Sequence, residues 1–486
     1  MKILHITITL LLLIFSEHLS SQQTSFEFIL STPLDEFITD IIETPDGSIY
    51  FSGQLSTIEQ PDNKYALLAK LDRYGSMSDS NIFHYPEKSI QIRHIIPSDN
   101  QLFTIVSTVF DKWNSWKEAG LVLNKMDINL NLSDQTNYYF PPTYLSELFC
   151  SQEKSNGNIT VGGAFLIDNN LYRPFIYEFS PTFDSLKAKV WLENDDNGIV
   201  FKIKEMPDGN YWIIKALRFR YEMLDSTFNV ITRQKIPDFI TGNYGVKWDT
   251  DTSFYLLGDT HLERPPHTLG FIRQFHPMDT TGHLYNHWRV SDTVDFPAEM
   301  NGIDFKNKDS IFMGGTRNMW LGYYNPWPSW FIVLQTDSLL NIRWERFYGG
   351  DAYYMMGKVV ATNDGGCLVA GTRYDYLNTT ELETDIIILK LNSDGLILGD
   401  EENPIVEMHE AIVYPNPGNE MINVRIAAQH KHSLFELFDL NGRQVLQQNF
   451  TGTLGTVNTG FLQPGTYIYK ITNQQGLNES GKWLKQ

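Results

Sequence analysis

Cysteine is almost absent from this chain of 486 residues, which contains only Cys150 and Cys367. Two thiols that lie so far apart in the sequence provide neither a disulfide framework nor a cysteine-rich metal site. We therefore expect two small buried residues, each lying in a strand.

Positive charge is also scarce. The chain has 38 Lys and Arg against 58 Asp and Glu, which gives a formal net charge of −20 at pH 7. A surface of this sign repels nucleic-acid phosphates and anionic lipid headgroups. We therefore expect neither a nucleic-acid partner nor electrostatic docking on a membrane.

Long apolar runs are confined to the N-terminus. Residues 3–15 are almost wholly apolar, Lys2 precedes them, and small and polar residues follow over 16–21. This order is typical of a secretory signal peptide, here residues 1–21, with cleavage expected just before Gln22. No later segment reaches the roughly 18 apolar residues that a transmembrane helix requires. We expect an exported mature chain without a transmembrane span.

The middle of the chain contains a degenerate repeat of strands and tight turns. The last copy is the clearest: residues 356–362 and 367–372 read as strands around the turn 363–366, and a third strand follows at 385–392. Residues 38–72 repeat this order around Pro45-Asp46-Gly47, because Asp-Gly pairs favour hairpin turns. We take the residue at the end of the second strand as the landmark of each copy, and successive landmarks lie 42–57 residues apart. The landmarks are Gly53, Ser107, Gly162, Ala216, Gly258, Gly314 and Gly371.

Seven strand-rich units of this length indicate a seven-bladed β-propeller over residues 22–398, with six or eight blades as alternatives. Segments between the units, such as 342–349, would form the outermost strands. The last unit lacks such a strand, whereas residues 26–30 form a strand that has no unit of its own. We expect residues 26–30 to complete the last blade, because an open array would expose two sheet edges.

The C-terminal part has a different composition. We expect an acidic linker over 399–410, and the 76 residues 411–486 then carry a net charge of +2. Short alternating segments flank the turn Asn441-Gly442, and a second turn at Pro464-Gly465 precedes another strand. This pattern predicts a small Ig-like antiparallel β-sandwich, so the whole chain is expected to be all-β.

Four motifs in residues 411–486 resemble those of the C-terminal sorting domains of type IX secretion substrates, of the type A kind. The first is Tyr414-Pro415-Asn416-Pro417, and the others are the hairpin around Asn441-Gly442, the turn Pro464-Gly465, and a basic final strand with Lys482 and Lys485. One departure is Gln486, where many members end in lysine. A plain accessory sandwich domain is the alternative.

The resemblance implies export in two steps. The signal peptide would take the chain across the inner membrane, and the outer-membrane translocon would then recognise the sorting domain. In many members a sortase removes this domain at the cell surface, and the passenger is attached to anionic lipopolysaccharide or released. The partners that the resemblance implies are therefore the type IX secretion machinery and a sortase.

Motifs for catalysis and cofactor binding are not found in the sequence. There is no phosphate-binding loop, nucleophile elbow or regular metal-ligand spacing. Segments 193–198 and 249–251 are rich in side-chain oxygens, so Ca²⁺ binding stays an alternative, although neither segment has calcium-loop spacing. We expect no catalytic residue, no bound metal and no cofactor. Five histidines are irregularly spaced along one segment, which favours solvated side chains over a metal site. They are His261, His267, His276, His283 and His287.

The long loops after the second strands carry the best candidates for a ligand site. Because successive strands alternate in direction, these loops and the connections between blades emerge on one face of the propeller. Two of the loops are rich in aromatic rings, which stack on sugars or anchor protein partners. The alternative is a loop that buries its own rings. The candidate ligand-binding residues are Trp113, Trp116, Trp320, Tyr323, Tyr324, Trp327 and Trp330.

Three functions are compatible with this sequence. We expect a non-catalytic surface module, either secreted or anchored at the outer membrane, whose propeller binds a glycan or protein ligand. A propeller enzyme acting on polysaccharide, a hydrolase or a lyase, would instead require carboxylates or a histidine at the mouth of the central channel. The third alternative is a structural or adhesion component of the envelope.

Overall fold

The computed structural model describes residues 24–57, 60–84, 88–98, 102–111, 120–139, 144–167, 171–192, 198–216, 220–235, 245–260, 268–279, 282–288, 293–319, 322–378, 382–398, 405–427 and 430–486. Strands dominate these residues, and no α-helix occurs among them. The all-β prediction is confirmed. In the described part of the chain, no helix is therefore present that could cross a membrane. The segment expected to be a signal peptide lies outside the described residues, and so it stays a prediction.

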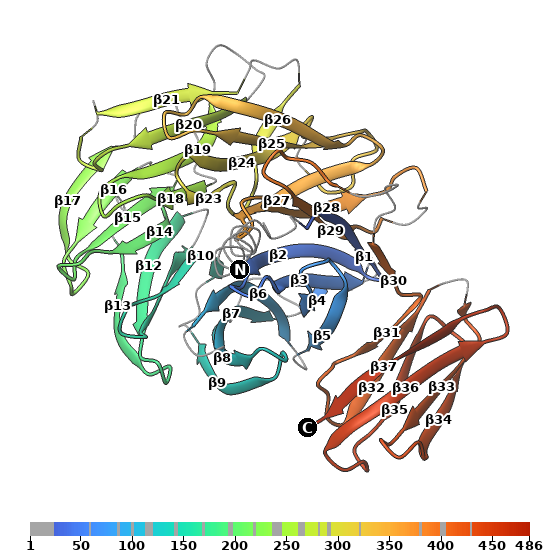
Figure 1. Cartoon of the computed structure of the whole chain (residues 1–486). Coiled ribbons are helices and arrows are strands. Elements are labelled where there is room, and N and C mark those ends of the chain that lie inside the picture. Colours follow the sequence, from blue (N-terminus) through green and yellow to red (C-terminus); the bar gives the residue numbers. More distant parts are fainter. Residues whose placement is uncertain are drawn as a thin grey trace, which may run out of the picture.

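Seven sheets surround a common centre (Figure 1). The first four contain β2 (Asp35–Glu43), β3 (Ile49–Thr57), β4 (Gln60–Leu71) and β5 (Met77–Phe83); β6 (Lys88–Pro97), β7 (Leu102–Asp111), β8 (Gly120–Asp127) and β9 (Leu132–Tyr139); β10 (Tyr144–Glu153), β11 (Ile159–Ile167), β12 (Leu171–Phe179) and β13 (Ser185–Val190); and β14 (Ile199–Glu205), β15 (Tyr211–Ala216), β16 (Arg220–Leu224) and β17 (Val230–Lys235).

The next two sheets contain β18 (Gly245–Trp248), β19 (Phe254–Thr260), β20 (Thr268–Gln274) and β21 (His283–His287), and then β22 (Asp295–Pro297), β23 (Ile303–Asn307), β24 (Ser310–Arg317), β25 (Trp330–Thr336) and β26 (Ile342–Gly349). The seventh sheet contains β27 (Tyr353–Ala361), β28 (Cys367–Tyr374), β29 (Asp385–Leu391), β1 (Phe26–Ser31) and β30 (Ile405–Met408). Each predicted landmark lies on the second long strand of its sheet.

The seventh sheet joins the two ends of the repeat region. Strand β1 pairs antiparallel with β29, with Phe28 opposite Ile388. This is the closure that the unpartnered N-terminal strand predicts. Strand β30 then adds to β1 in parallel, in a segment for which the sequence predicts only a linker. The segment therefore differs from that expectation, because four of its residues find an open strand edge to pair with.

Apolar side chains fill the space between every two neighbouring sheets. One cluster joins the first sheet to the second, through Tyr50 and Phe103 among others. Five further clusters join the following neighbours in turn. The last joins the seventh sheet back to the first, and β1 contributes Phe28 and Leu30 to it. The sheets therefore shield one another around a closed circle and need no covering layer of helices.

Two kinds of turn recur around the circle. The expected hairpins have a glycine in the left-handed region, with φ of +83° at Gly47 and +80° at Gly157. Four turns between third and fourth strands instead hold a buried hydrophobic residue at positive φ, whereas the corresponding turns of the first and seventh sheets have Gly75 and Gly395 there; the four residues are Leu130, Phe183, Phe228 and Leu340. In the first of these turns, Asp127 Oδ1 accepts hydrogen bonds from two backbone N–H groups. That carboxylate stabilises a conformation that such side chains rarely adopt.

The innermost strand of the sixth sheet is interrupted. Strands β22 and β23 both pair with β24, Ala298 and Gly302 still bond to Gly314 of β24, and the three residues 299–301 between them leave the sheet. These residues bond to the next sheet instead: the Met300 N–H donates to the Gly357 carbonyl at 2.8 Å, and the Val359 N–H donates to the Asn301 carbonyl at 2.9 Å. The interruption brings Glu299, Met300 and Asn301 toward the centre of the ring.

The C-terminal domain consists of two sheets that share one core. One sheet contains β31 (Ala411–Tyr414), β32 (Met421–Ile426) and β35 (Leu454–Asn458). The other sheet contains β33 (Ser433–Phe438), β34 (Gln444–Phe450), β36 (Gly465–Asn473) and β37 (Asn478–Lys485). Trp483, Phe435 and Ile422 meet in this core. The domain lies beside the strand β5 and the strand β30 (Figure 1).

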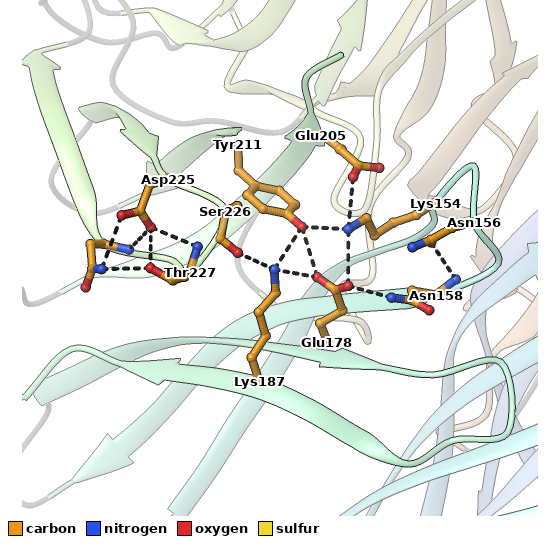
Figure 2. A network of polar contacts seen from close by, with 11 residues as sticks. Lys154, Asn156, Asn158, Glu178, Lys187, Glu205, Tyr211, Asp225, Ser226 and Thr227 are labelled. Carbon is orange, nitrogen blue, oxygen red and sulfur yellow. Dashed lines mark hydrogen bonds and ion pairs between the residues drawn. The ribbon is translucent and has the colours of Figure 1, made fainter. Parts of the chain in front are cut away.

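A polar network links the third and fourth sheets on the hairpin-turn side (Figure 2). Glu178 is almost fully buried and lies 3.1 Å from Lys154 Nζ and 3.0 Å from Lys187 Nζ. Its carboxylate also accepts hydrogen bonds from Asn158 and Tyr211. Burial raises the pKa of this carboxyl, but the four donors outweigh burial and hold the pKa at about 2. All its acceptor positions are used, so this is a structural network.

We expect Glu178→Gln to lower the free energy of unfolding by about 2–4 kcal/mol at pH 7. The buried Lys154 and the partly exposed Lys187 then lose the carboxylate that they share, and Lys154 keeps only Glu205 as a counter-ion. The folded pKa is lower than the unfolded one, so this stabilisation is present above pH 4.5 and is lost as the pH falls toward 2. Urea unfolding at pH 7 and pH 3 measures both effects. The exposed Glu420→Gln is the control and should change little at either pH.

Candidate functional site

A cavity of about 800 Å³ lies at the centre of the ring of sheets. The innermost strands β2, β6, β10, β14 and β27 line it, together with the interrupted segment of the sixth sheet. The start of β2 and the loop after β24 also line it. They lie on the face that the sequence predicts to carry the long loops, and we call this end of the cavity its mouth. The volume of the cavity suits a drug-sized ligand or a short saccharide.

The same irregularity recurs in five of these strands. The pairing of each innermost strand with its neighbour shifts by one residue at the same level of the sheet. A β-bulge of this kind redirects the side chain that follows it, and bulges are frequent beside functional sites. We name the five residues after the bulges the bulge ring; all of them line the cavity: Asp40, His94, Cys150, Lys202 and Lys358.

Asp40 and Lys358 form an ion pair within the bulge ring. Asp40 is 5% exposed in its side chain, and its two carboxylate oxygens also accept hydrogen bonds from the N–H groups of Ile41 at 2.9 Å and Ile95 at 2.8 Å. The pair ties the first, second and seventh sheets together. Both oxygens of Asp40 are therefore occupied by groups of the protein itself.

Lys202 is partly buried on β14, and its side chain lines the cavity. Its surroundings hold Cys150, Lys358, Asp40 and Lys247, yet none of the described side chains forms an ion pair or hydrogen bond with its ammonium group. Burial lowers the pKa of Lys202 to about 8. At pH 7 the side chain is therefore still mostly charged.

His94 and Cys150 complete the bulge ring as uncharged groups. Burial lowers the pKa of His94 to about 4, and its Nε2 atom has no hydrogen-bond partner within the described structure. Burial also raises the pKa of the Cys150 thiol to about 12. The thiol is free and buried, as is that of Cys367, which confirms the expectation for both cysteines.

Two predicted ligand-binding residues lie at the mouth of the cavity. Tyr323 and Tyr324 are 38% and 36% exposed, and both line the cavity wall. The Tyr323 ring packs edge-on against Phe37, with ring centroids 4.6 Å apart. The Tyr324 hydroxyl donates to the Asp35 carboxylate, which also accepts from the Thr384 N–H at 2.9 Å. Both rings are therefore held in place and keep an open surface.

The remaining aromatic candidates lie elsewhere. Trp327 packs against a buried cluster that contains Tyr353 and Tyr374. Trp330 is on β25, where the Arg317 guanidinium lies 5.8 Å from its ring. Neither residue lines the cavity. Trp113, Trp116 and Trp320 lie outside the described residues, so their role stays a prediction.

The possible cation ligands do not meet in the described part of the chain. His276, His283 and His287 are described, and no three His, Cys, Asp or Glu side chains there form a group that could hold a metal ion. Asp249 pairs with Arg273, and Asp251 pairs with Lys204. His261, His267 and residues 193–197 lie outside the described part.

Sequence reasoning missed the bulge ring. Its members from Asp40 to Lys202 are separated by 52–56 residues, Lys358 follows 156 residues after Lys202, and periodicity alone does not reveal a bulge. A signal is nevertheless present: a charged or polar residue interrupts an apolar inner strand at the same place in several repeats, as in Ile38-Thr39-Asp40-Ile41 and Ile92-Arg93-His94-Ile95. Aligning the copies on this position would have identified the ring.

The C-terminal motifs form a second group of functional residues. The Asn416 side chain donates to the Lys482 carbonyl at 2.9 Å and accepts from the Leu484 N–H at 3.0 Å. The Trp483 indole N–H donates to the Pro415 carbonyl at 2.9 Å. The first motif and the final strand are separated by more than sixty residues in the sequence, and these hydrogen bonds join them in the structure.

The other predicted motif residues occupy different places in this domain. Tyr414 is 2% exposed, and its ring packs on Tyr65 of the first sheet, with ring centroids 4.7 Å apart. Asn441-Gly442 forms an exposed turn, with Gly442 at φ of +78°. Pro464-Gly465 opens strand β36. On the last strand Lys482 is exposed, whereas Lys485 is buried and bonds to Asn419. Pro417 is half-buried.

Comparison with known families identifies the C-terminal domain. Residues 412–486 match the family described as the secretion system C-terminal sorting domain. The resemblance seen in the four motifs is thereby confirmed, and this part of the chain is a type IX secretion sorting domain. No curated protein matches the chain.

Three solved structures show a low level of similarity to the chain. The chain is similar to a streptogramin B lyase (14% identity, TM-score 0.44, covering 75% of this chain and 98% of that one). It is also similar to a fungal alcohol oxidase of the AA5 family in complex with copper (10% identity, TM-score 0.45, covering 94% and 98%). A third similar structure is YCF48 from Cyanidioschyzon merolae (10% identity, TM-score 0.43, covering 76% and 99%). Similarity at these levels gives no basis for transferring an activity.

Proposed function

We propose that this protein is a non-catalytic binding module whose central cavity takes a glycan. The type IX sorting domain implies secretion to the outer-membrane surface or beyond. In the proposal, the domain directs the ring of sheets through the outer membrane, a sortase removes the domain there, and the passenger is released or attached to lipopolysaccharide.

The cavity with two tyrosines at its mouth is the observation that carries this proposal. Tyrosine rings that are fixed at one edge and open on a face can stack on a sugar ring at low entropic cost. The cavity wall is mixed: apolar residues such as Ile95 and Leu148 line it together with the polar side chains of Gln54, Gln91 and Ser56. A pocket with aromatic surface and a few placed polar groups suits a small ligand better than a broad protein interface.

The experiment is a glycan array probed with residues 22–486, followed by calorimetry with the glycans that bind. Tyr323→Ala should weaken binding about tenfold or more and leave thermal unfolding nearly unchanged, because that ring is partly exposed. Trp327→Ala is the matched control, because its ring packs outside the cavity. It should lower the midpoint of unfolding and leave affinity unchanged in the folded fraction. If Tyr323→Ala binds every glycan as wild type does, the proposed site is wrong.

An enzyme is the second candidate function. His94 lines the cavity as a neutral imidazole with a free nitrogen, and the carboxyl groups of Asp35 and Glu299 line the same cavity. A base and carboxyl groups around one cavity are what hydrolysis or elimination on a polysaccharide would need. Asp35, however, already accepts hydrogen bonds from Thr384 and Tyr324. Glycans that bind should therefore be recovered intact after long incubation, and shortened products would favour the enzyme.

A further inference from the structure

The bulge ring carries one positive charge for which the described part of the chain provides no ion-pair partner. At pH 7 it contains two ammonium groups, Lys202 and Lys358, and one carboxylate, Asp40, whereas the histidine and the thiol are uncharged. The other charged side chains of the cavity are two cations, Lys64 and Arg93, and two acids, Asp35 and Glu299. The balance of the cavity is therefore one excess positive charge, in a chain whose formal net charge is −20.

That excess charge belongs to Lys202. Asp40, the nearest carboxylate in the ring, is already bound to Lys358 and to two backbone N–H groups. Lys247 faces Lys202 from the fifth sheet and is itself paired with Asp304 at 2.7 Å. An enclosed ammonium group without a counter-ion is costly, and proteins keep such groups where a ligand or a reaction uses them.

We propose that the cavity binds a sugar acid whose carboxylate pairs with Lys202 while its ring lies against the tyrosines at the mouth. This inference rests on the proposed function and names its ligand class. A single excess charge matches one carboxylate. A phosphate or sulfate ester places a denser charge beside Asp40 and the acids at the mouth, so it fits less well.

The direction of entry follows from the same geometry. The aromatic groups Tyr323, Tyr324 and Phe37 lie at the mouth, whereas Lys202 lies on strand β14 in the wall formed by the inner strands. A ligand with an apolar ring face at one end and a carboxylate at the other can satisfy both at once. A neutral sugar satisfies only the mouth and leaves the ammonium group without a counter-ion.

The test compares D-glucuronate with D-glucuronamide, its uncharged analogue, and with D-glucose, by calorimetry on residues 22–486 at pH 7. Glucuronate should bind at least about tenfold more tightly than the amide, because only the acid forms a charge-assisted contact. Lys202→Met should remove this preference, and Lys202→Arg should keep part of it. Glucose 6-phosphate serves as the phosphate probe and should bind more weakly than glucuronate.

The outcomes separate the two proposals. If neutral glycans bind at the tyrosines and glucuronate gains nothing over its amide, the sugar-acid inference is overturned while the proposed function stands. If glucose 6-phosphate binds more tightly than glucuronate, the carboxylate assignment is wrong. If no saccharide binds, both proposals fail. The comparison of acid with amide uses the wild-type protein, so it decides the matter even if a Lys202 variant does not fold.

Discussion

Replacing Lys202 with methionine should stabilise the ligand-free protein at pH 7, by about 1–3 kcal/mol in the free energy of unfolding. The reason is that folding removes this ammonium group from much of its water, while no described side chain forms an ion pair with it. Methionine has a similar length, fills the same space and has no charge to desolvate. Most core substitutions destabilise a protein, so a gain at this position would be a specific result.

The effect should depend on pH in a defined direction. The folded pKa of Lys202, about 8, lies below the unfolded value of 10.5, so folding disfavours the charged form. The penalty is fully present below pH 8 and is relieved as the pH rises from 8 to 10.5. The stability difference between Lys202→Met and wild type should therefore be largest near pH 7 and shrink toward pH 10. Urea unfolding at a series of pH values measures this difference.

Lys358→Met is the matched control for this prediction. It makes the same chemical change in the same ring, but it leaves Asp40 buried without its cation. Removing one partner of a buried pair is destabilising, here by about 3 kcal/mol. The two lysines should therefore respond with opposite signs. A loss of stability in both variants would show that Lys202 has a counter-ion after all.

Replacing Phe28 with alanine should lower the free energy of unfolding by about 3–5 kcal/mol, the second large effect. Phe28 is fully buried on β1, packs edge-on against Phe51, and lies between the seventh sheet and the first. Deleting residues 24–31 removes Phe26, Ile29 and Leu30 as well. At about 1.5–3 kcal/mol for each buried side chain, the deletion should cost as much as the whole stability of a typical domain.

Urea unfolding followed by tryptophan fluorescence measures the Phe28→Ala effect. Phe461→Ala is the control, because that ring is 64% exposed in the C-terminal domain and should contribute almost nothing. The deletion variant should show no cooperative transition. A deletion variant that unfolds like wild type would contradict closure of the ring by β1.

The sequence predicts most of the ring because its signals are local. Alternating apolar residues and Asp-Gly turns identify the strands, and a strand without a unit predicts the pairing of β1 with β29. Strand β30 was missed because its pairing depends on an edge that another part of the chain provides. The split between β22 and β23 was also missed, because Glu299, Met300 and Asn301 bond to the backbone of the next sheet and not to β24.

The candidate site could be predicted only in part. Loop position and residue type point to Tyr323 and Tyr324, which do line the cavity. The same reasoning includes Trp327, whose ring packs into a core instead, because composition does not tell an open ring from a covered one. Lys202 could not be singled out, since its importance depends on what Asp40 and Lys247 already bind.

The central claim is that the cavity holds an uncompensated ammonium group that a ligand carboxylate can reach. NMR titration of side-chain-labelled lysines, assigned with Lys202→Met, tests it most directly. We expect one lysine whose pKa is near 8 and rises when glucuronate is added, since a carboxylate favours the charged form. A Lys202 that titrates with the surface lysines and does not respond to glucuronate would contradict it.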